Sequence, residues 1–212
     1  MIHWSVTDGV GLAVLDRQER RNALDMATVV ELTDCLTSGD APAVPVVVTG
    51  AGTTFCSGFD LSTRSEGQRF KEHGDRLFEA VLAYPAPVIA AIGGPAVGLG
   101  AVLAACCDLR VASAQAWFEI PAARLGVVLD AAYIERVRAR FGMAAAQLLF
   151  VASRRIDARR ALELGAIHAL ADDPVAEATA WAEHAASLAP ASLAAHKAFL
   201  NGFQRDPPTE GG

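Results

Sequence analysis

Short apolar runs alternate with amphipathic stretches along the first two thirds of the chain. Positions 3–16 alternate between polar and apolar residues around Asp8 and Gly9, a pattern that predicts a β-hairpin. The runs 45–50 and 88–92 are short and strongly apolar, which is typical of strands buried on both faces of a sheet. Apolar residues in 26–36 have helical spacing, and we expect either Asn22 or Asp25 to cap that helix.

The rest of the pattern extends this alternation and then becomes helical. Residues 62–83 begin polar and end amphipathic, so we expect a mobile surface segment at 64–76 followed by a helix. Further strands are expected at 108–111, 117–120 and 167–170, and further helices at 131–141, 143–151, 157–164, 174–188 and 192–201. These elements predict an α/β fold with a mainly parallel sheet and a helical C-terminal region.

A glycine-rich turn separates the strand at 88–92 from a small apolar block at 101–107. The turn contains Gly93, Gly94, Pro95, Gly98 and Gly100 and has no polar side chain. A strand, a glycine turn and a buried helix together aim backbone N–H groups from the helix start into a cavity, where they suit an anion or a polarised carbonyl oxygen. The alternative is a tight turn needed only for close packing.

Composition and charge exclude several classes of protein. The chain is 52% hydrophobic and 20% charged, so we expect a packed core, and its net charge of −6 argues against nucleic acid as a partner. No apolar stretch is long enough for a membrane span, and the N-terminus has no pattern of a secretory signal. The four cysteines form no CxxC pair, so we expect no metal site and no disulfide framework, and a cytoplasmic location.

A second glycine unit, Cys56-Ser-Gly-Phe-Asp60, follows the strand at 45–50. Together with Arg21-Asn-Ala-Leu24, Pro87–Ile92 and the turn at 94–100, it resembles the enoyl-CoA hydratase/isomerase (crotonase) superfamily from Val10 to about Leu200. The resemblance implies a crotonase (ClpP-like) spiral of ββα units with a core at 1–188, a shortened helical segment at 189–204 and a flexible tail at 205–212. It also implies a homo-oligomer (a trimer or a dimer of trimers) and an acyl-CoA thioester as ligand, with no separate cofactor.

The resemblance assigns roles to particular residues. The backbone N–H groups of Phe59 and Leu99 would form an oxyanion hole for the thioester carbonyl. Residues expected near coenzyme A are Arg20, Arg21, Ala23, Ser57, Gly58 and Asp60, although the two arginines equally suit a solvated charged turn. Residues expected to line the acyl pocket are Leu61, Val102, Ala122, Val128 and Leu129; their apolar character favours a lipid-like acyl chain.

The chain departs from the pattern of hydratases in this superfamily at both catalytic glutamates. The corresponding positions are Val102 and Ala122, which cannot move a proton, so we expect little or no hydratase activity. The overall pattern is similar to mycobacterial-type homologues that carry fatty acyl-CoA without turnover. The chain also ends earlier than most members, so we expect a more open pocket and altered subunit contacts.

Asp130 is the remaining candidate for chemistry, as a base or nucleophile in an isomerase, thioesterase or dehalogenase. The favoured role for Asp130 is the N-cap of the helix that follows, and the two roles are compatible. A third possibility is an interaction protein that keeps the fold as an assembly module, and a dinucleotide-binding role for Gly98 and Gly100 is disfavoured because the third glycine and an acid are missing.

Other polar residues are expected to be structural. Glu119 is expected on a solvated strand face, with an inward-pointing side chain as the alternative if the strand is shifted. Glu135 is expected in a surface pair with Arg138 or Arg136. Asp60 is expected to brace its own turn, and Lys197 to be exposed, although it also suits contact with the phosphates of coenzyme A. The histidines are expected to be structural or at the surface: His3, His73, His168, His184 and His196.

Overall fold

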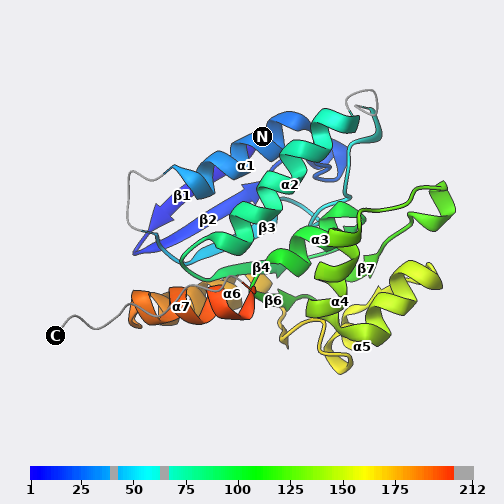
Figure 1. Cartoon of the computed structure of the whole chain (residues 1–212). Helices are drawn as coiled ribbons and strands as arrows, with labels where there is room; N and C mark the ends of the chain where they lie inside the picture. The colour runs from blue at the N-terminus through cyan, green and yellow to red at the C-terminus, as the bar shows by residue number, and fades with distance from the viewer. Residues whose placement is uncertain (39–42, 63–66, 203–212) are drawn as a thin grey trace.

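A six-stranded sheet forms the centre of the molecule, which we describe from a computed structural model over residues 1–38, 43–62 and 67–202 (Figure 1). Its strands lie in the order β1-β2-β3-β4-β6-β9. β1 and β2 form the predicted antiparallel hairpin, and every other neighbouring pair is parallel. The strands are β1 (Ile2–Thr7), β2 (Val10–Leu15), β3 (Val46–Gly50), β4 (Val88–Ile92), β6 (Leu109–Ala112) and β9 (Ala169–Leu170).

A smaller sheet carries the glycine turn at 93–100. Its strands are β5 (Ala96–Val97), β7 (Trp117–Glu119) and β8 (Ile156–Asp157), with β7 in the middle. β5 pairs with β7 in parallel and β8 pairs with β7 in the antiparallel direction. Because β5 is part of the turn, its pairing with β7 holds the turn in place.

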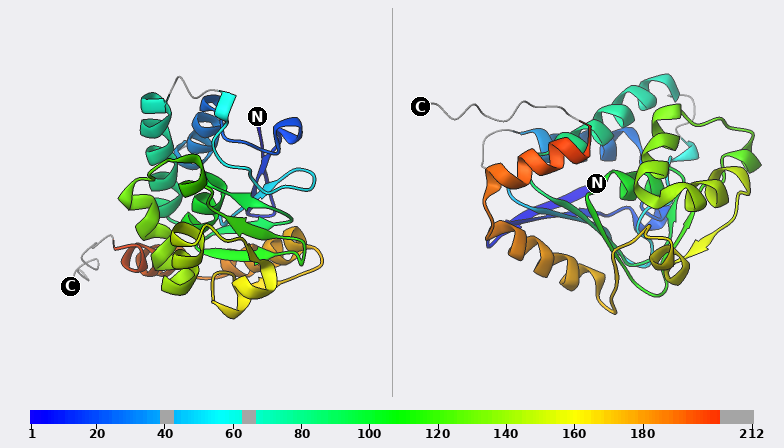
Figure 2. Two further views of the ribbon diagram at one scale, coloured as in Figure 1. Left: turned by 90° about the vertical axis from the view of Figure 1, so that its right-hand side faces the viewer. Right: turned by 60° about the horizontal axis from the view of Figure 1, so that its bottom comes forward.

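Helices cover both faces of the large sheet (Figures 1 and 2). Helices α1 to α3 cover one face, where Val46 and Val48 join the larger core, and α4 packs on α3. Helix α6 packs against the other face, where Val47 and Ile89 contact it. Because helices cover both faces of the sheet, strands β3 and β4 are apolar on both sides. The helices are α1 (Met26–Thr37), α2 (Gly67–Ala83), α3 (Leu99–Cys106), α4 (Ala131–Ala146), α5 (Ala158–Glu163), α6 (Pro174–Ala186) and α7 (Pro190–Leu200).

Helix boundaries follow the caps that the sequence indicated. Asp25, not Asn22, caps α1, because its carboxylate accepts from Thr28 N–H at 2.8 Å. Helix α2 begins at Gly67, so the part of the charged stretch 64–76 from residue 67 onward is helical; residues 64–66 and the tail lie outside the described residues. The helices expected at 131–141 and 143–151 form one helical run with a break at Gly142, whose φ is +82°.

Lys197 is buried, so the prediction of an exposed lysine is wrong, and the alternative contact with coenzyme A finds no support in its position. Its ammonium donates to the carbonyls of Val81 and Ala86 at 3.1 and 3.0 Å and lies 2.7 Å from a carboxylate oxygen of Asp108. Burial lowers the pKa of Lys197, while Asp108 opposes that shift. The amine thus binds the carbonyls at the end of α2 and fixes α7 against the body of the protein.

Membrane-spanning helices and clustered metal ligands are both absent from the described residues. Over residues 1–38, 43–62 and 67–202, no helix combines the length and the hydropathy needed to cross a membrane. Across the same residues, no group of three or more His, Cys, Asp and Glu side chains is arranged to hold a metal ion.

Candidate functional site

The two glycine units that the sequence indicated lie against each other. Cys56 N–H donates to Pro95 O at 3.1 Å, and Val97 N–H donates to Cys56 O at 2.9 Å. The approach is close enough to require glycine: a Cβ on Gly100 would lie 2.3 Å from Cys56 O, and a Cβ on Gly58 would lie 2.6 Å from Val97 O. Gly58 also has a φ of +91°, which L-residues rarely adopt.

The backbone N–H groups of Phe59 and Leu99 have no acceptor within the described part of the chain. Leu99 is the first residue of α3, where N–H groups lack intrahelical partners and the helix dipole is positive. The two segments adjoin, since a Cβ on Gly58 would lie 3.1 Å from Leu99 N. Gly98, which precedes the helix, is held by its own N–H bond to Glu119 O at 2.8 Å.

Phe59 and Leu99 both line a cavity of about 620 Å³. Its walls come from the loop 57–61, from α2, from the turn before α3, from the stretch 120–130 and from the start of α4. Among the described residues, the charged ones in its lining are Lys71 and Asp130. Four residues expected in an acyl pocket line this cavity: Leu61, Ala122, Val128 and Leu129. Val102 does not line it, because its side chain is completely buried inside α3. A largely apolar cavity of this kind suits an apolar ligand.

A second cavity of about 300 Å³ adjoins the first and shares Ser57, Phe59 and Leu61 with it. Five of the six residues expected near coenzyme A line this second cavity: Arg20, Arg21, Ala23, Ser57 and Asp60. Gly58 is not among the lining residues. The charged loop before α1 and the apolar cavity are therefore parts of one continuous surface.

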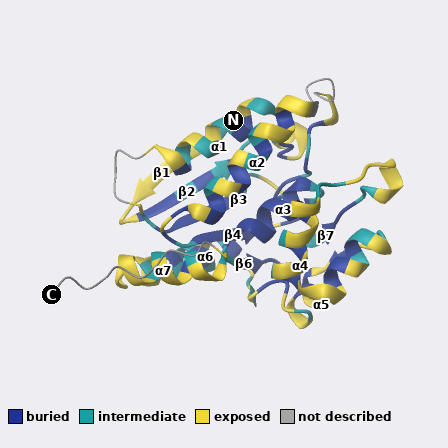
Figure 3. Cartoon of the chain, in the orientation of Figure 1, coloured by how far each residue is buried: buried dark blue, intermediate teal, exposed yellow. Residues whose placement is uncertain are grey.

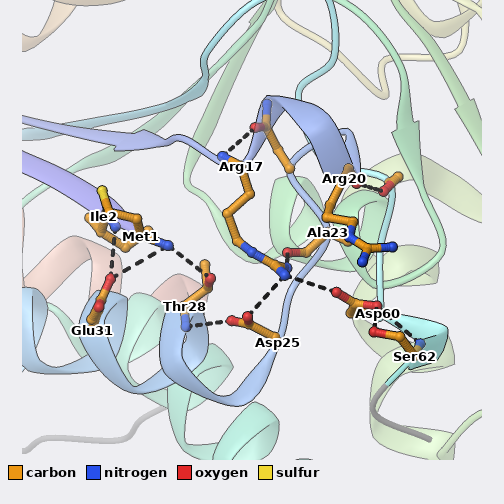
Figure 4. Close-up of polar contacts among 12 residues, drawn as sticks. Met1, Ile2, Arg17, Arg20, Ala23, Asp25, Thr28, Glu31, Asp60 and Ser62 are labelled. Carbon is orange, nitrogen blue, oxygen red and sulfur yellow. Dashed lines mark hydrogen bonds and ion pairs between the residues drawn. The ribbon is translucent and has the colours of Figure 1, made fainter.

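Arg17 organises the loop beside the second cavity (Figure 4). Its guanidinium lies 3.0 Å from the carboxylates of both Asp25 and Asp60 and donates to Ala23 O at 2.6 Å. Asp60 also accepts from the backbone N–H and the hydroxyl of Ser62, so the predicted bracing of its own turn is confirmed. The Ser62 bonds, with help from Arg17, lower the pKa of Asp60 to about 2.

Asp130 caps α4 as expected, accepting from Ala132 N–H at 2.9 Å. Its other oxygen lies 3.2 Å from the ammonium of Lys71, which is also 2.7 Å from Asp75. Tyr133 donates its hydroxyl proton to Asp75, so α2 and α4 are joined by a polar network beside the cavity. The Ala132 bond and then Lys71 lower the pKa of Asp130, which keeps it ionised and makes it a weak base.

Glu119 is buried, so the prediction of a solvated strand face is wrong. Its side chain is 9% exposed and forms ion pairs with Arg124 and Arg155, both more than half exposed. The guanidinium of Arg155 lies 3.5 Å from the ring centre of Trp117, which holds it in place. The two arginines come from separate segments, and sequence spacing alone did not indicate that they meet at Glu119.

The chain is similar to known proteins over almost its whole length. The family model for enoyl-CoA hydratase/isomerase matches residues 5–210. The chain belongs to the enoyl-CoA hydratase/isomerase family. A probable enoyl-CoA hydratase of Mycobacterium tuberculosis, echA6, is 37% identical over 202 residues, which cover 95% of this chain and 82% of the relative. A probable enoyl-CoA hydratase of Rhodobacter capsulatus is 34% identical over 207 residues, covering 95% and 80%.

Solved structures of the family have the same fold. An enoyl-CoA hydratase/carnithine racemase from Magnetospirillum magneticum superposes with a TM-score of 0.89 at 30% identity, covering 98% of this chain and 82% of that one. A putative enoyl-CoA hydratase/isomerase from Mycobacterium abscessus gives a TM-score of 0.87 at 32% identity, covering 98% and 85%. The expected crotonase fold is therefore confirmed.

Sequence reasoning missed several polar residues of this family member. Arg17, Lys71, Asp75 and Tyr133 were not singled out, and only the i,i+4 spacing of Lys71 and Asp75 gave a signal. Glu135 pairs with Arg138, as predicted. His168 lies at the surface, and its ring accepts from Arg110 N–H; desolvation of the ring lowers its pKa to about 4, which fits the expected structural or surface role.

Proposed function

We propose that the chain binds a fatty acyl-CoA thioester whose carbonyl oxygen accepts hydrogen bonds from Phe59 N–H and Leu99 N–H. The observation that carries the proposal is that Phe59 and Leu99, whose amides have no acceptor in the described part of the chain, both line one largely apolar cavity. A carbonyl oxygen between them would satisfy both donors, and the positive end of α3 favours the partial negative charge on that oxygen.

The two cavities suit the two halves of such a ligand. The apolar cavity of about 620 Å³ would take the acyl chain, and each methylene buried there would contribute about 0.8 kcal/mol. The cavity lined by Arg20 and Arg21 would take phosphates of coenzyme A. Ser57, Phe59 and Leu61 lie in both walls, which is where the thioester linkage would pass.

We further propose little or no hydration of enoyl-CoA. Adding water across a double bond needs a group that accepts a proton from water. The two positions at which the resemblance expects glutamates are Val102, buried inside α3, and Ala122, in the cavity wall. Among the described residues, Asp130 supplies the carboxylate in the cavity lining, and its bonds to Ala132 N–H and Lys71 oppose a role as base. We also propose that the chain forms a homo-oligomer, a trimer or a dimer of trimers, and that it is located in the cytoplasm.

Calorimetry with butanoyl-, decanoyl- and hexadecanoyl-CoA tests binding, and mass spectrometry after incubation with crotonyl-CoA tests hydration. We expect tighter binding of longer chains and no 3-hydroxybutanoyl-CoA above the level without protein. Absence of binding at every chain length would favour an assembly module and overturn the proposal. Hydration at rates typical of enzymes, on the order of 1–1000 per second, would overturn the statement on turnover.

An acyl-CoA enzyme that uses Asp130 is the second candidate, because this ionised carboxylate lines the cavity. It would act as base or nucleophile in an isomerase, thioesterase or dehalogenase. Asp130→Asn keeps a good N-cap, so the variant should retain its stability. Products formed from a panel of enoyl-, aryl- and acyl-CoA by the natural protein, and lost in this variant, would decide for the second candidate.

A further inference from the structure

We infer that Glu119 is a positioning residue that fixes one wall of the acyl cavity, the stretch 121–130, against the turn that carries Leu99. This inference rests on the proposed function. The stretch, which we call the cavity wall segment, supplies Ala122, Leu125, Val128 and Asp130 to the lining. Any factor that fixes this segment therefore fixes the shape offered to an acyl chain.

The cavity wall segment has few anchors of its own. In the described part of the chain, the backbone hydrogen bonds of residues 121–129 all join residues of the same segment. The segment projects from the body between β7 and α4 and is largely exposed (Figure 3), with Val128 at 92% and Leu125 at 55%. Ala122 and Leu129 pack against the core near its two ends. The position of the middle of the segment therefore depends on side-chain contacts.

Two ion pairs supply those contacts. Arg124, in the middle of the segment, pairs with Glu119, and Asp130, at its end, pairs with Lys71. The Lys71–Asp130 pair is the weaker anchor, because both side chains are at least one-third exposed and exposed pairs contribute little. The Glu119 carboxylate is nearly enclosed, so its pairing with Arg124 is less screened by solvent.

Glu119 also belongs to the other side of the cavity. Its backbone carbonyl accepts from Gly98 N–H, the residue before Leu99, and its strand pairs with β5 through Val97. Arg155, stacked on Trp117, forms a second ion pair with the carboxylate and prevents it from turning away. One residue thus holds the carbonyl-binding turn with its backbone and the acyl wall with its side chain.

This role predicts a specific change in binding. Glu119→Gln keeps the size of the side chain, but it removes the charge and replaces one acceptor oxygen with an NH2 donor. The side chain can then no longer pair with both Arg124 and Arg155, and the wall loosens. Each added methylene should strengthen acyl-CoA binding about fourfold in the natural protein and clearly less in the variant. Affinity for decanoyl-CoA should fall about tenfold, while affinity for free coenzyme A stays within about twofold.

Calorimetry across the butanoyl-, decanoyl- and hexadecanoyl-CoA series measures the gain in affinity per added methylene, which we call the chain-length slope. Glu135→Gln is the matched control. Glu135 is an exposed carboxylate paired with Arg138 on α4, outside the cavity lining, and its variant should keep the natural slope. Arg124→Met should give the same shallower slope, and the buried carboxylate of Glu119 keeps Arg155 as its partner in that variant. Arg124→Met therefore tests the inference even if Glu119→Gln does not fold.

The outcomes separate the two proposals. If the natural protein binds no acyl-CoA, the proposed function fails before Glu119 is tested. If the natural protein binds with a chain-length slope and both Glu119→Gln and Arg124→Met keep that slope, the positioning role is overturned. A uniform loss that affects coenzyme A and every acyl chain equally would indicate general damage to the fold and would also overturn it.

Discussion

Gly58→Ala is the substitution that most directly disturbs the space between Phe59 and Leu99. The new Cβ would lie 2.6 Å from Val97 O and 3.1 Å from Leu99 N, and backbone atoms cannot swing aside as a flexible side chain can. The φ of +91° adds strain of about 1–3 kcal/mol for a residue with a Cβ. The turn must therefore shift, and the Leu99 amide must shift with it.

The substitution should remove the part of the binding affinity that comes from hydrogen bonds to the ligand's carbonyl oxygen. Two hydrogen bonds to a thioester oxygen contribute about 1 kcal/mol each, or roughly 30-fold in affinity. Decanoyl-CoA should therefore bind the natural protein about 30-fold more tightly than S-decyl-CoA, a thioether of similar size without the carbonyl. In Gly58→Ala this ratio should fall towards one. Calorimetric titration with both ligands gives the ratio without a chemical step.

Gly9→Ala is a control variant that introduces backbone strain without the steric clash expected in Gly58→Ala. Gly9 has a φ of +77°, and its new Cβ would have no neighbour within 4 Å. Both variants should therefore lose stability, by about 2–4 °C in Tm for each kcal/mol, but only Gly58→Ala should lose the discrimination between thioester and thioether. If Gly58→Ala folds and keeps the natural ratio, the two amides do not bind the carbonyl.

Three further predictions concern charged side chains. Lys197→Met should destabilise the fold by about 3–5 kcal/mol in chemical denaturation, because it leaves Asp108 without its buried partner. Lys71→Met should raise the pKa of Asp130 in a carboxyl NMR titration, because Lys71 helps to lower it; an unchanged titration would contradict this. The pKa of Asp60 is lowered from its ordinary value of 3.8 to about 2. Ionised Asp60 therefore stabilises the fold at pH values above 3.8, and this contribution is lost as the pH falls from about 4 to 2. Asp60→Asn should remove that part of the acid dependence when unfolding is followed against pH.

Local patterns predicted most of the backbone. The Asp8-Gly9 turn, the apolar strands and the Asp130 cap each depend on residues close in sequence, and each is present in the structure. The close approach of Gly58 to the turn before α3 involves segments far apart, yet glycine signals it because no other residue fits there. Such features are predictable because the residue type itself carries the constraint.

The buried charges were not predictable in the same way. Glu119 and Lys197 are ordinarily surface residues, and their burial depends on partners that only the fold brings near: Arg155 for the first, and Asp108 with the end of α2 for the second. Val102 was placed in the acyl pocket by resemblance, but α3 turns that side chain into the core. Periodicity says which face of an element is apolar and does not say which charged groups meet across elements.

The carbonyl stretching frequency of bound acyl-CoA, carrying carbon-13 at the thioester carbon, reports directly on the hydrogen bonds to its oxygen. Two donors from Phe59 and Leu99 polarise the C=O bond and weaken it. Infrared difference spectra of decanoyl-CoA with the natural protein should show a lower frequency than the free ligand, and Gly58→Ala should return it towards the free value. A bound thioester with the frequency of the free ligand would contradict the proposed carbonyl site.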